Sequence, residues 1–442
     1  MRVTLIKPNI GSMGRGPYID EGRMEPLNIG VLAGLTPTDI DLKFYDDRME
    51  TIPYDEPTDI VAITVETFTA RRAYEIAERY REHGVRVVLG GMHPMLLPEE
   101  AAKHADSVVI GDAESVWQTV LSDAMHGHLR KSYYGPPGVA QCDGSFPRRD
   151  IFNGKGYLPI TLLQYTRGCR FACDFCAVSR YFDRRNHIRQ IDQVVREIVE
   201  QDRRFLFFVD DNIATDHGAL KELCAALRPL HVSWVSQASI DITSDPDLMK
   251  GLRDSGCLGN VIGFESISPE SLREAKKGTN LERWTGFSDE LKVIREYGLQ
   301  TWAAFTVGYD HDTVASIDAT LDFALRNRFA FAAFNVLMPY PGTDLYARLA
   351  AEDRLLYGGR WWLHPDYRFN YASFVPKRMM PDELTAACHR ARAEFNSLPS
   401  IVRRATDKNN LRSVAHFVRL LGYMRLFRRE VLKKHGMIFG KR

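Results

Sequence analysis

The first part of the chain, residues 1–132, alternates short apolar runs with amphipathic stretches. The apolar runs cover residues 3–6, 42–45, 60–65, 85–89 and 108–110. Residues 70–83 carry apolar positions at a helical period, and Gly84 follows them, as is typical beyond a helix end. This alternation predicts an α/β fold, a doubly wound Rossmann-like domain whose parallel sheet has helices on both faces.

A second α/β unit is expected after a linker. Residues 133–158 are rich in Pro and Gly without periodicity, which predicts the linker. From 159 to 345 the alternation restarts, with strands expected at 160–165, 205–209, 232–236, 261–264, 302–307 and 332–338. The helices expected between them are 191–199, 217–228, 246–255, 281–297 and 313–327. Six strand-helix units predict a partial TIM-type (β/α)6 barrel, open enough for a large substrate.

Composition changes this picture little. Of the 442 residues, 45% are hydrophobic and 26% are charged, and 58 basic side chains balance 57 acidic ones, so overall charge indicates no partner. The amino terminus is typical of a buried strand and not of a signal peptide. No apolar run approaches the about 18 residues that span a bilayer. Scattered cysteines (Cys142, Cys224, Cys257 and Cys388) favour a reducing cytoplasm.

The remaining three cysteines form the most informative motif of the chain. Cys169, Cys173 and Cys176 fall within eight residues, and no fourth cysteine lies near. A structural zinc site needs four protein ligands, whereas an iron-sulfur cluster held by three thiolates leaves one iron open to another ligand. We therefore expect a cluster with an open coordination site. A zinc loop with a distant fourth ligand, or a chance grouping, is the alternative.

Polar or glycine-containing motifs follow every predicted strand of the barrel. In chain order they are the cysteine loop, Asp210-Asp211-Asn212, Gln237 with Ser239, Glu265-Ser266, Gly308-Tyr309 and Pro339-Tyr340-Pro341-Gly342. Each alone is explained as well by a helix cap, an ion pair or a turn. Reactive groups of such barrels collect at the carboxyl ends of the strands, so the six together predict an active site there.

This arrangement resembles the radical S-adenosylmethionine (SAM) superfamily over about residues 160–345. The resemblance implies that Cys169, Cys173 and Cys176 hold a [4Fe-4S] cluster whose open iron chelates SAM. It also implies that reductive cleavage of SAM gives a 5′-deoxyadenosyl radical that abstracts hydrogen from the substrate. A Gly-Gly-Glu segment usual in the family is replaced here by Asp210-Asp211. The SAM contacts that it implies are Phe175, Asp210, Asp211, Gln237, Glu265, Val307, Gly308 and Leu337.

The order of the two domains is similar to the cobalamin-binding class within that superfamily. Gly90-Gly91-x-His93-Pro94 and Gly111-Asp112-x-Glu114 also resemble that class. Many cobalamin domains supply a cobalt ligand from an Asp-x-His-x-x-Gly loop, but the stretch compared with it here, Asp46 to Thr51, has neither the histidine nor the glycine. His93 is expected to be a turn or surface residue. Two hypotheses stay open: a cobalamin-dependent methyltransferase, or an enzyme that keeps the domain as a scaffold.

The substrate is expected to be a small molecule. The missing histidine favours the scaffold hypothesis, and the class suggests a radical dehydration or deoxygenation of an amino sugar in antibiotic biosynthesis. The alternative is a cobalamin-dependent C-methyltransferase or a lipid- or tetrapyrrole-modifying enzyme. Hydrogen-bonding or acid-base candidates on the barrel rim are Asp241, Tyr309, His311, Asn335 and Tyr340.

Residues 346–442 are expected to form an aromatic loop region followed by helices. The aromatic residues 361–374 are interpreted as a cover of the open barrel, either a plain seal or a substrate wall. Between 402 and 442, twelve Lys or Arg stand against Asp407 and Glu430, with an apolar stripe at helical spacing. This basic amphipathic helix packs on the domain in the simplest interpretation. Docking of an acidic electron donor, such as flavodoxin or its reductase, ranks next, then a membrane surface.

Two further classes compete with the radical SAM interpretation. One is a zinc-stabilised binding protein with a nucleotide-binding first domain. The other is a tRNA-modifying radical enzyme, which the basic tail permits. No RNA-binding module is recognisable, so nucleic acid is not expected as a partner.

Overall fold

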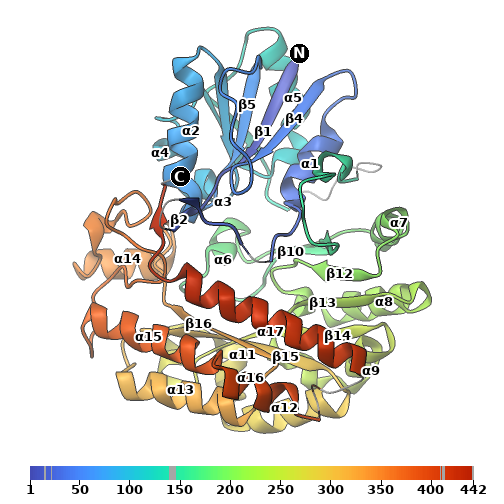
Figure 1. Cartoon of the computed structure of the whole chain (residues 1–442), viewed down its shortest axis with the longest axis vertical. Coiled ribbons are helices and arrows are strands. Elements are labelled where there is room, and N and C mark those ends of the chain that lie inside the picture. The colour runs from blue at the N-terminus through green and yellow to red at the C-terminus, as the bar shows by residue number, and fades with distance from the viewer. Residues whose placement is uncertain (14–15, 21, 139–145, 409, 411–413, 441–442) are drawn as a thin grey trace.

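The computed structural model describes residues 1–13, 16–20, 22–138, 146–408, 410 and 414–440. Cys142 and part of the predicted linker lie outside these residues. Figure 1 shows two α/β units one above the other, with the first part of the chain forming the upper one.

The upper unit is built on a parallel sheet of six strands in the order β4-β1-β5-β6-β7-β8. These strands are β1 (Arg2–Lys7), β4 (Asp41–Asp46), β5 (Ile60–Thr64), β6 (Arg86–Gly90), β7 (Ser107–Gly111) and β8 (Ser132–Gly135). The order reverses between β1 and β5, which is where doubly wound sheets bind ligands beyond the strand ends. The predicted doubly wound fold is confirmed.

Helices cover both faces of this sheet, as the periodicity predicts. They are α1 (Leu27–Leu35), α2 (Ala70–Glu82), α3 (Met92–Leu96), α4 (Pro98–Ala101) and α5 (Trp117–Met125). Ile76 and Ala77 of α2 are fully buried against one face, while Ile29 and Ala33 of α1 are buried against the other. The stretch predicted as a linker from 133 differs from the structure, because β8 pairs with β7 and belongs to the sheet.

The lower unit is a second parallel sheet of six strands, in the order β16-β15-β14-β13-β12-β9. Its strands are β9 (Thr161–Leu163), β12 (Phe205–Phe208), β13 (Ser233–Ala238), β14 (Cys257–Glu265), β15 (Gln300–Val307) and β16 (Phe331–Val336). The predicted partial barrel is confirmed, since the described strands run in one sequential order without joining β16 to β9.

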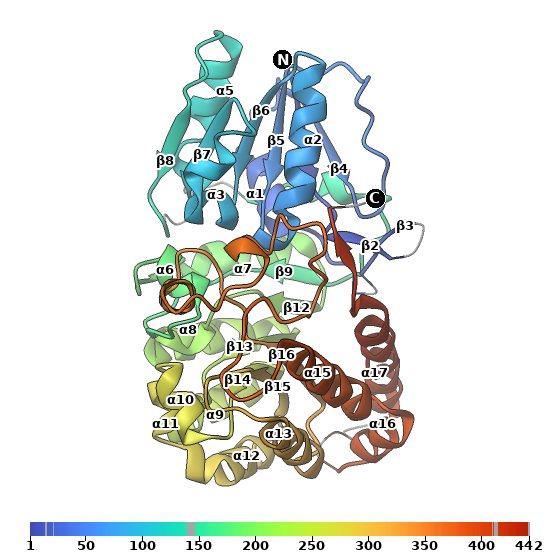
Figure 2. The ribbon, with the colours of Figure 1, turned by 90° about the vertical axis from the view of Figure 1, so that its left-hand side faces the viewer.

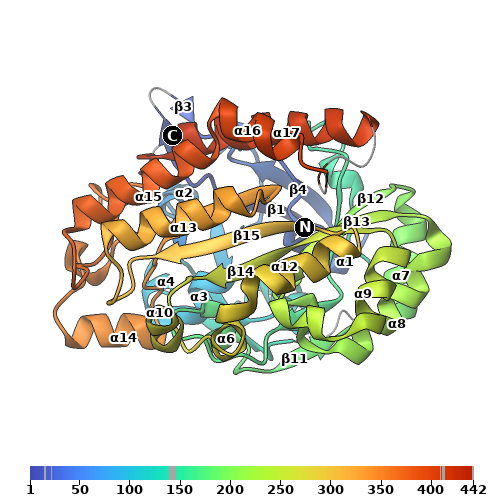
Figure 3. The same ribbon diagram turned by 90° about the horizontal axis from the view of Figure 1, so that it is seen from below.

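The outer helices follow the strands as the sequence predicts, with one break. They are α7 (Ile191–Gln201), α8 (His217–Leu227), α9 (Pro246–Asp254), α10 (Pro269–Glu274), α11 (Gly278–Leu281), α12 (Phe287–Glu296) and α13 (Val314–Arg326). The expected helix 281–297 begins only at Phe287, after α11 and a short turn. Seen from below, α7, α8 and α9 lie at one end of the sheet and α13 at the other (Figure 3).

The last hundred residues return along the molecule to the first unit. After α14 (Asp344–Ala351), helices α15 (Pro381–Phe395), α16 (Leu398–Ala405) and α17 (Val414–Lys434) lie beside the barrel (Figure 2). Leu420 and Met424 of α17 are buried against Phe331 of the edge strand β16. The final strand β17 (Ile438–Phe439) pairs with β2 (Gly11–Met13), which also pairs with β3 (Gly16–Pro17).

The aromatic residues before α15 seal the junction of the two units. Trp361, Trp362 and Tyr367 are at most 1% exposed and belong to the same apolar cluster as α2. Phe68 of the first unit contacts Trp361, with ring centroids 5.2 Å apart. Of the two interpretations of this stretch, the described geometry favours the hydrophobic seal.

Candidate active site

The three cysteines lie on one loop at the carboxyl ends of the barrel strands. A small antiparallel ladder, β10 (Thr166–Gly168) with β11 (Asn186–Ile188), flanks the loop, and α6 (Ala177–Tyr181) begins after Cys176. Gly168 has a φ of 86°, and a Cβ there would lie 2.1 Å from the carbonyl oxygen of Arg185. Only glycine therefore fits the turn that leads into the first cysteine.

Charged and polar side chains surround the thiols. Asn212 Nδ2 lies 3.8 Å from Cys169 Sγ. Burial raises the pKa of Cys173 to about 12, although the positive charge of Lys277 acts in the opposite direction. A free Cys173 thiol is therefore protonated at neutral pH and becomes a ligand only by losing its proton to a metal. Among the described residues, no group of three His, Cys, Asp or Glu side chains is placed so that it could bind a single metal ion.

Asp210 and Asp211 hold the strand that leads into the cysteine loop. The carboxylate of Asp210 is fully buried and accepts the backbone N–H groups of Tyr165 and Thr166. Burial raises its pKa to about 7. Asp211 Oδ2 accepts the N–H of Gly168 at 2.8 Å. Backbone N–H groups therefore bind the carboxylates of both residues, and the ammonium contacts of Asp210 and Asp211 stay predictions.

The other expected SAM contacts lie on neighbouring strand ends. Glu265 sits at a bulge between β14 and β15, with a φ of 62°, and its carboxylate lies 3.2 Å from Lys277 Nζ and 2.9 Å from Thr306 Oγ1. Gln237 is exposed and donates to the carbonyl of Asp210 at 3.3 Å. These placements bring both residues to the rim that also holds the cysteine loop.

The segment expected to receive adenine is mostly backbone. The carbonyl of Val307 accepts the N–H of Leu337 at 2.8 Å, which joins the ends of β15 and β16. Gly308 has a φ of 110°, and its N–H donates to Asp312. Phe175 packs near Tyr309, with ring centroids 6.5 Å apart. Phe175, Val307, Gly308 and Leu337 thus lie around one part of the barrel, and their SAM contacts stay predictions.

The five candidate catalytic residues do not form a single cluster. Tyr309 is 1% exposed and its hydroxyl has no hydrogen-bond partner among the described residues, while His311 is exposed two residues later. Asp241 pairs with Arg170 of the cysteine loop at 3.3 Å. Asn335 accepts from Arg392 at 3.0 Å, and Tyr340 packs against Phe68 of the first unit. Asp241 thus lies beside Arg170 of the cysteine loop and Tyr309 beside Phe175, and Tyr340 is near enough to Cys176 for their charges to interact.

A pocket of about 500 Å³ opens between the two units. Apolar side chains of α1, of β5 to β7 and of α5 line the part in the first unit, namely Leu27, Ile29, Val31, Leu32, Ala62, Val88, Val109 and Trp117. Glu66, Asp112, Glu114, Arg167 and Asp211 line the end toward the cysteine loop. A Cβ on Gly90 would meet only Val109, at 3.6 Å, so the missing side chain of Gly90 leaves this space open. Its size and lining are typical of a site for an organic cofactor.

Ion pairs join the pocket to the cysteine loop. Arg167 lies 3.0 Å from Asp112 and 2.5 Å from Glu114. Tyr181, at the end of α6, donates to Asp112 at 2.6 Å. Sequence reasoning did not identify Arg167 as a functional candidate, although it stands two residues before the first cysteine. The sequence marks the Gly111-Asp112-x-Glu114 motif, but it does not show that Arg167 is the partner of its two carboxylates.

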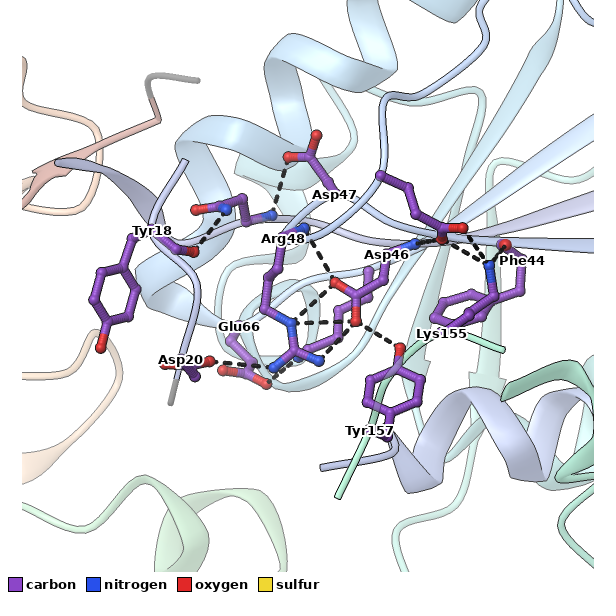
Figure 4. Close-up of polar contacts among 12 residues, drawn as sticks. Tyr18, Asp20, Phe44, Asp46, Asp47, Arg48, Glu66, Lys155 and Tyr157 are labelled. Atoms are coloured by element: carbon purple, nitrogen blue, oxygen red, sulfur yellow. Dashed lines mark hydrogen bonds and ion pairs between the residues drawn. The ribbon is translucent and has the colours of Figure 1, made fainter. Parts of the chain in front are cut away.

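The stretch compared with the cobalt-ligand loop does not line this pocket. Figure 4 shows Asp46, Arg48 and Tyr157 joined in a polar network at the end of β4. Arg48 Nη2 lies 2.7 Å from Asp46 and Nη1 lies 3.1 Å from Asp20. Asp47 pairs with Arg72 of α2 at 2.8 Å. These contacts fix the loop within the first unit and leave it no ligand directed at the pocket.

His93 also differs from its prediction as a turn or surface residue. It is fully buried, and its Nε2 lies 3.0 Å from Glu100 Oε1. Trp362 donates to the same oxygen at 3.0 Å. The imidazole therefore belongs to a buried network between α4 and the aromatic seal. No histidine or cysteine is among the residues that line the pocket.

Comparison with known proteins identifies both units. Residues 163–324 match the model of the radical SAM superfamily, and residues 22–121 match the B12 binding domain. The chain is 30% identical over 404 residues to bacteriochlorophyllide d C-12(1)-methyltransferase of Chlorobaculum tepidum, covering 88% of this chain and 87% of that protein. It is 31% identical over 352 residues to the C-8(2)-methyltransferase of the same organism, covering 74% and 77%.

A solved structure resembles nearly the whole chain. The radical SAM methyltransferase TsrM from Kitasatospora setae, with cobalamin and a [4Fe-4S] cluster bound, matches with a TM-score of 0.66 and 16% identity. The match covers 97% of this chain and 98% of that chain. At this identity the match shows the fold, including the placement of a doubly wound unit over a partial barrel.

Proposed function

Because the chain belongs to the cobalamin-binding class of the radical SAM superfamily, we propose that it methylates a carbon atom of a tetrapyrrole in a cobalamin-dependent reaction. Two relatives at 30% and 31% identity are named as methyltransferases of bacteriochlorophyllide d, and these names support the substrate class. The family membership makes the chain an enzyme and makes the zinc-stabilised binding protein untenable.

The cofactors of this family are a [4Fe-4S] cluster, SAM and cobalamin. Cys169, Cys173 and Cys176 fit the cluster, since they are the three thiols of one loop at the strand ends. The interdomain pocket fits part of cobalamin, because apolar side chains line its part in the first unit and Gly90 leaves it open. When bound, these groups supply a methyl carrier and a source of the 5′-deoxyadenosyl radical.

The observation that carries the proposal is the position of the pocket. It lies between the carboxyl ends of β5, β6 and β7 and the loop of the three cysteines, and residues of both units line it. A methyl carrier held there would lie next to the barrel face that carries the cysteine loop, and methyl transfer requires such proximity. Arg167 holds the two units together at this junction.

The protein's own groups position the reactants and exclude water. Asp241, paired with Arg170, and Tyr309, beside Phe175, are candidate side chains in contact with the cysteine loop. The buried aromatic seal of Trp361, Trp362 and Tyr367 closes one side of the junction against solvent. We propose that Asp241 and Tyr309 line the acceptor site, with Tyr340 near them and His311 and Asn335 outside it.

The comparisons favour the methyltransferase over the dehydration of an amino sugar that the missing histidine suggested. No relative described above is named as a dehydratase. A reductant is needed to start each cycle, and we propose an acidic protein such as flavodoxin as its source. No helix among the described residues is long and apolar enough to cross a membrane.

The proposal is tested by following a labelled methyl group. Enzyme reconstituted without oxygen is incubated with hydroxocobalamin, a reductant, SAM carrying a deuterated methyl group, and a bacteriochlorophyllide acceptor. We expect the deuterated methyl group in the pigment, together with S-adenosylhomocysteine and 5′-deoxyadenosine. Formation of 5′-deoxyadenosine with an unmodified pigment, under conditions where cobalamin is bound, would show that the substrate is of another class.

A further inference from the structure

Large apolar side chains are exposed along helices α16 and α17. Leu398 is 63% exposed and Val402 is 59% exposed on α16, while Val418 is 62% and Leu432 is 46% exposed on α17. Leu420 and Met424 of α17 are buried against Phe331, and the half-buried Leu421 packs against the same cluster. The exposed side chains are therefore additional to those that attach the helix to the barrel.

These exposed side chains border a groove with a basic rim. The groove has a volume of about 450 Å³, and its lining residues are Leu398, Ile401, Val402, Leu421, Arg425, Arg428 and Arg429. An apolar floor with guanidinium groups at its edge accommodates an apolar chain that ends in an anionic group. We call the groove and the exposed residues of α16 and α17 the α16–α17 surface.

The spacing along α17 places these residues on one side of the helix. Val418, Leu421, Arg425, Arg428 and Leu432 stand at positions i, i+3, i+7, i+10 and i+14. The sequence of α17 carries six Lys or Arg residues against Glu430 alone. A helix with projecting aliphatic side chains among basic ones is typical of a segment that lies in the interface of a membrane.

We propose that the α16–α17 surface docks on an anionic lipid bilayer. Val418 and Leu432 then enter the boundary between headgroups and acyl chains, and Arg425 and Arg429 meet the lipid phosphates. Clusters of Lys and Arg on an amphipathic helix are typical of binding to anionic lipids, and the sequence of α17 carries six such residues against one acidic residue. This inference is independent of the substrate proposed above.

Flotation of the full-length reconstituted enzyme with lipid vesicles tests the proposal. One set of vesicles contains phosphatidylcholine alone, and the other an equimolar mixture with phosphatidylglycerol. We expect flotation with the anionic vesicles, release by high salt, and little flotation with the neutral ones. Val418→Asp should lower the bound fraction on the order of tenfold, since a carboxylate cannot enter the acyl region and repels the lipid charge.

Matched controls separate docking from a general effect of substitution. Val199 of α7 is also 62% exposed, so Val199→Asp introduces the same change away from this surface and should float as the wild type does. The double variant Arg425→Glu/Arg429→Glu tests the charge contribution at two exposed positions. Arg428 is kept, because it donates to the carbonyl of Asn396 at 2.7 Å and supports the fold. Cluster absorbance reports that each variant is folded.

Three results would overturn the proposal. One is the absence of flotation with anionic vesicles, and another is equal loss of flotation in Val418→Asp and Val199→Asp. The third is binding of a purified flavodoxin, sensitive to Arg425→Glu/Arg429→Glu, by an enzyme that does not float, which would assign the surface to the electron donor.

Discussion

Arg167 Nη1 lies 3.0 Å from Asp112 Oδ2, and this ion pair joins the strand before the cysteine loop to the domain that forms the pocket. The side chains of Asp112 and Glu114 are 8% and 7% exposed. If Arg167 is removed, the two buried carboxylates lose the positive charge that offsets the free-energy cost of their desolvation.

Arg167→Gln is therefore expected to lower the free energy of unfolding by about 3–5 kcal/mol. Urea unfolding followed by tryptophan fluorescence measures the change. Arg185→Gln is the control, because Arg185 is 74% exposed and its change should stay within about 0.5 kcal/mol. Equal unfolding midpoints for the two variants would contradict a role of Arg167 in joining the domains.

Cys173→Ala should abolish the ultraviolet-visible band of the cluster and all formation of 5′-deoxyadenosine, because two thiolates cannot hold the cluster. Cys388→Ala provides the control, since it removes another buried thiol, on α15, away from the loop. Absorbance and chromatography of the products measure both effects. Retention of the band and the product in Cys173→Ala would disprove the ligand assignment.

Gly90→Leu should fill the interdomain pocket and weaken cobalamin retention on the order of tenfold, as expected for an overfilled site that costs about 1–3 kcal/mol. The cluster and SAM cleavage should persist. Cobalamin absorbance after gel filtration gives the bound fraction. Gly286→Leu is the comparison, because a Cβ at Gly286 meets no atom within 4 Å. Unchanged retention in Gly90→Leu would remove the pocket from consideration as the cobalamin site.

The attachment of the C-terminal segment should depend on pH. His389 of α15 and His435 stack with ring centroids 3.7 Å apart, and Tyr371 stacks on the other side of His435. Burial, reinforced by His389 and Arg392, lowers the pKa of His435 to about 4; burial also lowers that of His389. The folded state thus favours neutral rings.

The lowered pKa values stabilise the folded state as long as the rings are neutral. This contribution is fully present above the ordinary histidine pKa of about 6.5 and is lost as pH falls toward 4. The variant His435→Phe keeps an aromatic ring in the stack. Between about pH 6.5 and 4, we expect its apparent Tm to fall less than that of the wild type. Differential scanning fluorimetry measures it. His126→Phe changes an exposed histidine and should keep the wild-type slope; an identical slope in His435→Phe would refute the prediction.

Buried strands were predictable because continuous apolar runs mark them in both sheets. β8 was not, because it is an edge strand in which Tyr133 is buried while Tyr134 is 73% exposed. So short a segment beside Pro and Gly resembles a loop. The cysteine motif, likewise, was predictable because its three ligands are close together in the sequence.

Roles that depend on distant partners were not predictable. Asp210 has the position of a ligand-binding carboxylate, yet two backbone N–H groups some forty-five residues earlier engage it. His93 is buried because Glu100 and Trp362 lie against it, and Trp362 comes from the far end of the chain. Periodicity locates such residues on their elements but does not identify the partners that determine their roles.

The pairing of β17 with β2 affects how the enzyme responds to truncation and how it unfolds. Since Phe439 is buried and pairs with Gly11, the two ends of the chain close a ring through both units. Deleting the basic tail would also expose an edge of the first unit and part of its core. Opening of that junction should therefore be detected together at both ends of the chain in hydrogen exchange, as one cooperative unit.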